Sequence, residues 1–85
     1  MTELSSLPNV GKVLEKSLKQ VGILTADQLR TVGSIEAFLR IRANVDPGAC
    51  LHMLYGLEGA VQGMRDSLLP AEVKQDLKCF FNSLG

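Results

Sequence analysis

The chain is short of aromatic residues and has no excess of either charge, and both shortages limit what it can bind. It contains no tryptophan, its aromatic content is 5%, and nine basic residues balance nine acidic ones. Proteins that hold nucleic acid by charge alone concentrate lysine and arginine on their surface. The composition therefore excludes a protein of that kind. A mild asymmetry remains, because residues 1–45 hold six basic and four acidic groups, whereas residues 46–85 hold three and five.

Targeting and membrane-spanning segments are also missing. The start, Met1–Ser6, has neither the basic region nor the apolar stretch of a secretory signal. The most apolar region is interrupted by His52 and Glu58, and no uninterrupted apolar run approaches the length of a membrane span. We therefore expect a cytoplasmic protein with no membrane partner.

Cysteine and histidine are too sparse for a metal or redox centre. Cys50 and Cys79 lie far apart, without the close spacing of zinc ligands or of a redox pair. His52, the single histidine, lies two residues from Cys50, and on a helix that spacing directs the side chains apart. We expect both cysteines to be buried as small apolar residues, and His52 to be a half-exposed packing residue. We expect no metal and no cofactor.

The sequence motifs of common enzyme classes are absent as well. The chain has no paired carboxylates, no glycine-rich phosphate loop and no serine at a strand-to-helix turn. General acid–base catalysis needs a second polar group beside the base, and none is apparent near His52. We therefore predict a non-enzymatic protein with no catalytic residue and no small-molecule substrate.

Helical periodicity runs through the whole chain. Apolar residues recur at helical spacing, and no segment alternates with a period of two. The 85 residues suffice for one domain, which we predict to span 1–85. The sequence thus predicts an all-α, compact domain of five helices, or six if residues 2–6 form a turn. Short connections make consecutive helices spatial neighbours.

Glycines and capping residues mark the ends of the first predicted helices. Gly22 and Gly33 are predicted to end the first two helices, because glycine adopts the left-handed conformation that follows a helix. Thr25 is predicted to cap the second helix in a capping box with Gln28. Ser34 is predicted to cap the third.

The fourth predicted helix is nearly apolar around its circumference. Asp46 and Pro47 resemble an N-cap and a first helical residue, so the helix is expected to run from Pro47 to about Met64, or roughly 27 Å. A helix that is apolar on most sides is enclosed by others. We therefore predict that it is the longest helix and lies at the centre of the fold.

Three glycines share one face of this helix. Gly56, Gly59 and Gly63 are spaced i, i+3, i+7, and each glycine inside a helix costs about 1 kcal/mol relative to alanine. We predict that the three glycines allow the backbone of another helix to pack closely against this face. The alternative is an interface in a homodimer.

The segment 7–12 predicts a tight turn before the first helix. Pro8 stiffens the turn, Val10 can point inward, and Gly11 allows the backbone to reverse. The amides of Val10, Gly11 and Lys12 would then form an anion site at the helix start. Lysines at i, i+4 and i+7 of the helix face away from its leucines and can contact neighbouring phosphates; they are Lys12, Lys16 and Lys19. The same stripe is also compatible with an ordinary solvated face.

This turn and helix resemble the helix-hairpin-helix motif of DNA-binding proteins, and longer stretches resemble the TfoX/Sxy C-terminal domain. The resemblance is carried by the segments 7–11, 21–23, 29–33, 49–55 and 57–63. It implies a helix-hairpin-helix, SAM-like fold and kinship with bacterial regulators of natural competence, which are thought to act with a transcription factor at promoters.

The chain departs from that family in two respects. The regulators carry an additional N-terminal domain, and we expect this chain to be a stand-alone C-terminal domain. The family tends to have a Trp-His pair before its Leu-Pro, where this chain has Asp66 and Ser67. Two hypotheses for function follow. The hairpin contacts DNA weakly and without sequence preference, or the domain docks on a transcription component or a separately encoded protein.

Overall fold

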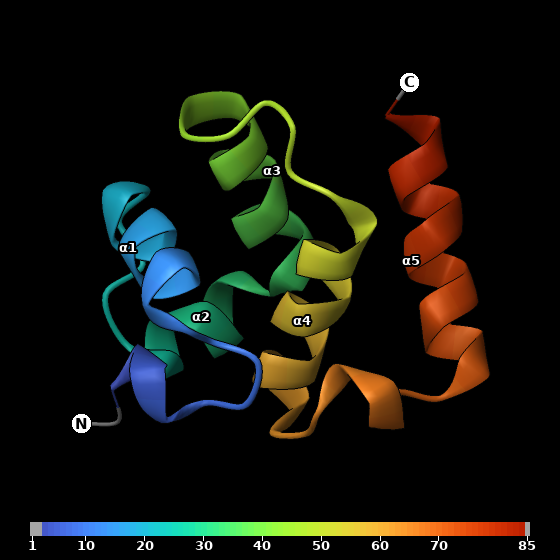
Figure 1. Cartoon of the computed structure of the whole chain (residues 1–85), viewed down its shortest axis with the longest axis horizontal. Helices are drawn as coiled ribbons and strands as arrows, with labels where there is room; N and C mark the ends of the chain where they lie inside the picture. Colours follow the sequence, from blue (N-terminus) through green and yellow to red (C-terminus); the bar gives the residue numbers. More distant parts are fainter. Residues whose placement is uncertain (1–2, 85) are drawn as a thin grey trace.

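Five α-helices joined by short loops make up the fold, shown by a computed structural model that describes residues 3–84 (Figure 1). The elements in chain order are a 3-10 turn η1 (Leu4–Ser6), α1 (Lys12–Gln20), α2 (Ala26–Val32), α3 (Ser34–Asn44), α4 (Leu51–Gln62), a second 3-10 turn η2 (Asp66–Leu68) and α5 (Ala71–Ser83). Residues 3–84 contain no strand, so the all-α prediction is confirmed. The turn predicted over residues 2–6 corresponds to η1, and Thr2 lies outside the described residues. None of these helices is both long and apolar enough to cross a membrane.

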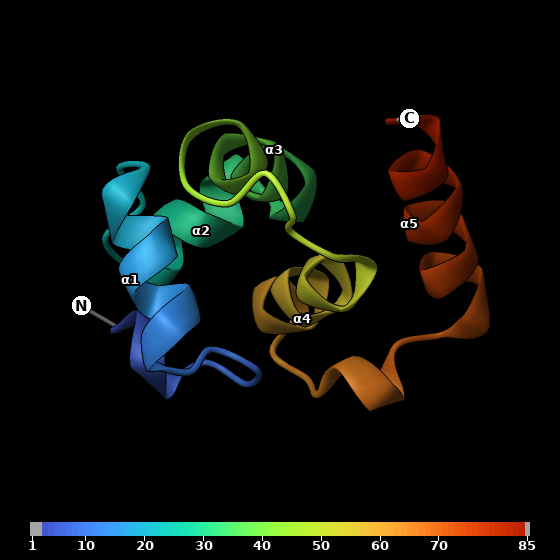
Figure 2. The same ribbon diagram turned by 45° about the horizontal axis from the view of Figure 1, so that its top comes forward.

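The helix at the centre of the fold is α4. It contacts α2, α3, α5 and η2. Figures 1 and 2 show it between the group of α1, α2 and α3 on one side and α5 on the other. Leu54, Leu57 and Ala60 are fully buried on it. Its predicted central position is therefore confirmed.

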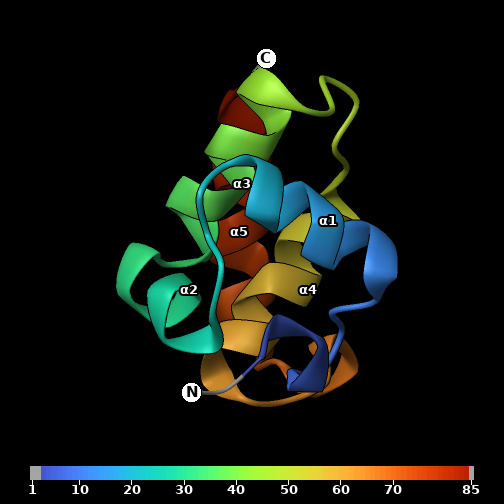
Figure 3. The ribbon, with the colours of Figure 1, turned by 90° about the vertical axis from the view of Figure 1, so that its left-hand side faces the viewer.

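The hydrophobic core is built mainly from the first four helices and their connections. The largest fully buried side chains are Phe38, Leu4, Leu18, Ile23, Leu29, Ile41, Leu54 and Leu57. α5 adds Leu77, and the ring of Phe81 meets the ring of Phe38 edge-on with centroids 6.0 Å apart. Fully burying one such side chain stabilises the fold by about 1.5–3 kcal/mol. These contacts hold α5 behind α3 and α4 in the view of Figure 3.

The predicted ends of α1 and α2 are confirmed. Gly22 and Gly33 have φ of +84° and +87°. The Oγ1 atom of Thr25 accepts a hydrogen bond from the Gln28 amide at 3.2 Å. The Gln28 side chain accepts in return from the Leu24 amide at 2.6 Å, one residue earlier than in the usual capping box.

The prediction that Ser34 caps α3 is wrong. Gly33 holds the capping position, and Ser34 is the first residue of the helix. Gly33 ends α2 and begins α3 without an intervening loop, so the cap falls one residue earlier than predicted. The Ser34 hydroxyl instead donates to a carboxylate oxygen of Glu58 at 2.5 Å and ties α3 to α4.

The predicted start and length of α4 are also wrong. Asp46 caps a local turn, because its Oδ1 atom accepts from the Gly48 amide at 2.9 Å and its carbonyl oxygen accepts from the Ala49 amide at 3.0 Å. This turn is not continued into a helix, and α4 begins at Leu51. With 12 residues α4 is about 18 Å long, and α5 is the longer helix with 13.

The late start of α4 also explains one of two errors about the cysteines. Both were predicted to be buried, and both are exposed. Cys50 occupies the N-cap of α4, outside the helix and its apolar stripe. Cys79 lies on the exposed side of α5, where its sulfur accepts from the Gln75 side chain at 3.5 Å.

The predicted glycine stripe consists of two different features. Gly56 and Gly59 are buried, and they face a loop rather than another helix. A Cβ atom on Gly59 would lie 2.5 Å from Nδ2 of Asn9 and 2.6 Å from the carbonyl oxygen of Met64, whereas one on Gly56 would lie 3.5 Å from Cβ of Asn9. Gly63 is exposed and ends α4 in the left-handed conformation with φ of +76°.

The loop that meets these glycines precedes α1 and is anchored by Asn9. The Nδ2 atom of Asn9 donates to the carbonyl oxygens of Gly56 at 3.3 Å and Met64 at 3.0 Å, and its Oδ1 atom accepts from the Asp66 amide at 3.2 Å. Among residues 3–84, Asn9 is the non-glycine residue with positive φ, at +69°. Asparagine tolerates this region better than most residues. One side chain thus joins the start of the fold to both the middle and the end of α4.

Alanine substitutions should separate the two buried glycines. Gly59→Ala is expected to destabilise the protein by about 1–3 kcal/mol, because the added methyl collides with Asn9 and with a backbone carbonyl. Gly56→Ala is the matched control and should be neutral or stabilising by up to about 1 kcal/mol, because its methyl fits and alanine favours the helix. Urea denaturation measures both values. Equal effects of the two substitutions would contradict the packing described for Gly59.

Substitutions of Asn9 should separate its hydrogen bonds from its backbone conformation. Asn9→Gly keeps the positive φ and removes three hydrogen bonds, so we expect a loss of about 2–3 kcal/mol. Asn9→Ala should cost about 1 kcal/mol more, because alanine resists the left-handed region. The same denaturation measurement applies. If Asn9→Gly has the same free energy of unfolding as the wild type, these hydrogen bonds do not hold the loop in place.

Candidate functional site: the start of α1 and the groove beside α4

The loop at residues 7–11 fixes the direction in which α1 begins. Val10 is buried, as predicted. The predicted role of Gly11 in reversing the chain is wrong, because its φ is −89° and Asn9 makes the reversal instead. Gly11 serves as the N-cap of α1. Sequence reasoning missed Asn9, although an asparagine between proline and Val-Gly is itself a turn signal.

Open backbone amides lie at the start of α1. The first hydrogen bond of this helix runs from the Glu15 amide to the Gly11 carbonyl at 2.9 Å, so the amides of residues 12–14 precede it and have no partner within the helix. The Val10 amide already donates to the Leu7 carbonyl at 3.4 Å. The open amides therefore lie further along the chain than predicted. Their end of the helix carries a partial positive charge.

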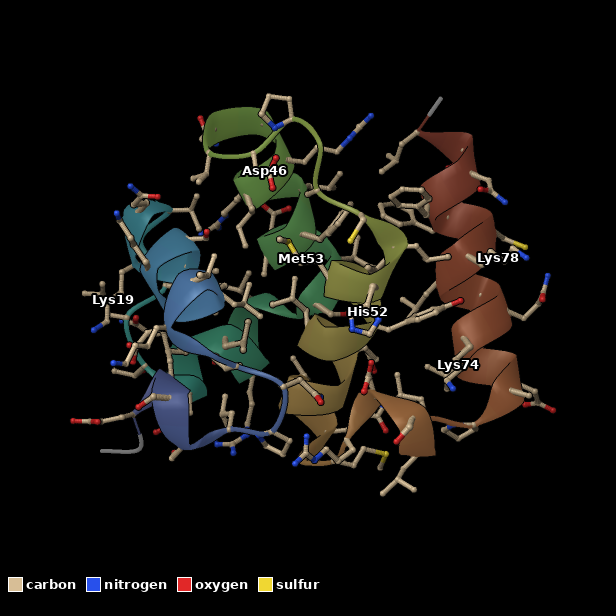
Figure 4. All side chains as sticks on the ribbon, viewed as in Figure 1. Lys19, Asp46, His52, Met53, Lys74 and Lys78 are labelled. Carbon is tan, nitrogen blue, oxygen red and sulfur yellow. The ribbon has the colours of Figure 1, made fainter. Side chains whose placement is uncertain are left out.

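The three lysines of α1 are all exposed, which matches the predicted outward stripe. Lys19 lies 4.0 Å from the Glu15 carboxylate, and Figure 4 shows it at the edge of the molecule remote from α4. Such an exposed ion pair contributes about 0–1 kcal/mol to stability. Among residues 3–84, no carboxylate comes within 4.0 Å of Lys12 or Lys16. These two lysines are therefore the ones available to a ligand.

A groove of about 590 Å³ opens beside this helix start, between α1 and the exposed side of α4. It is lined by Asn9, Gly11, Lys12, Val13, Leu14, Cys50, His52, Met53, Gly56, Arg65 and Asp66. Figure 4 shows Met53 on the side of α4 that faces α1. Sequence reasoning did not find this groove, because its walls come from three segments that only the fold brings together.

The side chains of His52 and Asp66 lie next to each other on the rim of the groove. The Nδ1 atom of His52 lies 3.6 Å from Oδ2 of Asp66, and the His52 side chain is 83% exposed. The prediction of a half-exposed His52 without an acidic neighbour is therefore wrong. Among the described residues, no three His, Cys, Asp or Glu side chains gather as metal ligands.

The sequence matches one family over almost its whole length. The profile of the TfoX C-terminal domain covers residues 1–81. Protein Sxy of Escherichia coli (strain K12) is 35% identical over 81 residues, which are 95% of this chain and 38% of that protein. DNA transformation protein TfoX1 of Aliivibrio fischeri is 27% identical over 74 residues, which are 87% of this chain and 35% of that protein. The chain thus spans less than two fifths of these relatives.

Solved structures share the fold at higher identity. An uncharacterised protein from Listeria monocytogenes, in a triclinic crystal form, has a TM-score of 0.95 and 53% identity over 98% of this chain and 93% of that one. A protein of unknown function from the same organism, in a tetragonal form, has a TM-score of 0.93 and 54% identity over 96% of this chain and 99% of that one. The family resemblance inferred from the sequence is confirmed, and this chain belongs to the TfoX C-terminal domain family.

Proposed function

We propose that the chain is a non-enzymatic regulatory domain that contacts DNA phosphates through the start of α1, weakly and without sequence preference. The observation that carries the proposal is the conjunction of open amides at residues 12–14 with the exposed Lys12 and Lys16. A relative, TfoX1, is named a DNA transformation protein, which is consistent with a role next to DNA.

The geometry suits a phosphate group for two reasons. A helix N-terminus offers several backbone N–H donors and a partial positive charge to one anion, so it needs no strongly basic protein. Lysines on the first two turns of the helix can contact neighbouring phosphates. Lys12 and Lys16 extend the site in this way, whereas Lys19 is partly neutralised by Glu15. Such contacts position a protein on DNA and carry no sequence information.

The proposal assigns no catalysis to the domain. General acid–base catalysis requires a group held within hydrogen-bond reach of the substrate proton. His52 and Asp66 are the acid–base pair found beside the groove, and His52 is largely in solvent. In the described part of the chain no serine or cysteine donates a hydrogen bond to His52. We therefore assign this pair to the surface of a binding site.

A second candidate function is docking on a protein partner. The groove favours it, because apolar side chains in an open groove match apolar side chains of a protein and not the sugar-phosphate backbone of DNA. The two functions share Lys12, but Lys16 belongs only to the phosphate site and Met53 only to the groove, so substitutions can separate them.

Titration of a fluorescein-labelled duplex tests the phosphate contact. Fluorescence anisotropy at low salt should show weak binding that is equal for unrelated sequences, with a slope of log K against log salt of about −2 to −3 for two or three contacts. Lys16→Glu should weaken binding to every duplex and reduce the slope by about 1. Lys78→Glu, on α5, is the matched control and should bind like the wild type.

Two results would overturn the proposal. One is a flat titration of the wild type at low salt. The other is an identical loss of affinity in Lys16→Glu and Lys78→Glu, since that would show a general charge effect without a site on α1.

A further inference from the structure

The groove between α1 and α4 has an apolar floor that the fold leaves open. Leu14 of α1 and Met53 of α4 lie on opposite sides of the groove, and both side chains are only partly buried. Gly56 has no side chain, so it widens the groove on the side of α4. Val13 stands at its edge with 81% of its surface exposed. A valine at this exposure contributes little to the core, so its apolar surface is available to a partner.

The charges at the rim of the groove are mainly positive. Lys12 lies on the α1 side and Arg65 lies beyond the end of α4, and both are exposed. The acidic residue of the lining, Asp66, already has partners: its Oδ2 atom lies 3.6 Å from His52, and its Oδ1 atom accepts from the Ser67 amide at 2.9 Å. The two cationic side chains, Lys12 and Arg65, outnumber the single carboxylate of Asp66, so the rim carries a net charge of +1.

We propose that this groove binds an acidic amphipathic peptide segment of a partner protein. One large apolar side chain of the segment enters between Val13 and Met53, and flanking carboxylates approach Lys12 and Arg65. Binding sites for compact ligands measure about 300–1,000 Å³, so a groove of about 590 Å³ has room for a bulky apolar side chain together with its neighbours in a short peptide. The apolar floor selects for an anchor residue, and the basic rim selects for acidic neighbours.

Two other occupants fit the groove less well. A sugar-phosphate backbone could pair with the basic side chains at the rim, but it would leave the apolar side chains of the floor without an apolar partner. A stable interface with a second copy of the chain needs about 800 Å² on each protomer, whereas Val13 is the exposed large apolar residue that the described lining offers. The peptide proposal shares Lys12 with the phosphate proposal, but Lys16 does not line the groove, so a substitution of Lys16 tests the phosphate contact alone.

Selection from a displayed library of random peptides tests the proposal directly. The full chain is the bait, and enriched peptides are synthesised with a fluorescein label and titrated by anisotropy. We expect enriched sequences to share a Leu, Ile, Met or Phe flanked by Asp or Glu. Their binding should weaken as salt increases, because the rim contacts are exposed.

Matched variants locate the binding surface. Val13→Ser should weaken the selected peptides about tenfold by removing apolar contact, and Arg65→Glu about fivefold by reversing a rim charge. The controls are Leu24→Ser, an exposed apolar residue outside the groove, and Lys78→Glu on α5; both should bind like the wild type. Circular dichroism and thermal melting confirm that each variant is folded.

The outcomes distinguish this proposal from DNA contact. Val13→Ser keeps the backbone amide of residue 13 and changes only the side chain, so it should leave binding of labelled duplex unchanged. Lys16→Glu should leave peptide binding unchanged, because Lys16 does not line the groove. The peptide proposal fails if no peptide is enriched, if enriched peptides lack acidic residues, or if Val13→Ser binds them like Leu24→Ser. It also fails if Val13→Ser loses duplex binding instead of peptide binding, because the groove would then be a nucleic-acid surface.

Discussion

The Asn9 side chain donates two hydrogen bonds and accepts a third, and these bonds hold the loop at residues 7–11 against α4 and the segment after it. The contact depends on Gly59, because a Cβ atom there would lie only 2.5 Å from Nδ2 of Asn9 and would collide with it. The loop in turn sets where α1 begins and therefore where its open amides point. It also places the first turn of α1 beside α4, which forms the groove. Both candidate binding surfaces thus depend on a single polar side chain packed against a glycine.

The two surfaces offer different chemistry at one end of the molecule. The amides and lysines of α1 suit an oxyanion in water, since they provide donors and charge without an apolar wall. The groove combines apolar side chains with basic residues at the rim, and that combination suits a carboxylate-bearing peptide. Lys12 belongs to both. A chain with no net charge can accommodate both because the positive groups are concentrated locally, while most acidic residues lie elsewhere and Glu15 is paired with Lys19.

Several elements could be predicted from the sequence because the determining forces are local. The glycines that end α1 and α2 and the capping threonine act within a few residues, so Gly22, Gly33 and Thr25 were identified correctly. The start of α4 was not, because Asp46 and Pro47 suit a helix start and an isolated turn equally well. The hydrogen bonds from the Gly48 and Ala49 amides to Asp46 stabilise the isolated turn instead of a helix. Because α4 starts later than predicted, Cys50 lies at the surface and not in the interior.

The sequence by itself determined the all-helical fold, the central place of α4, the outward lysines of α1 and the membership in a family, because periodicity and local motifs are written along the chain. Only the tertiary structure decided the roles of Gly59 and Asn9, because these residues are far apart in sequence and Gly59 leaves the space that the Asn9 side chain needs for its hydrogen bonds. The same holds for the groove and for the pairing of His52 with Asp66. These features arise where segments distant in sequence meet, and a linear pattern does not record which residues of different helices come into contact.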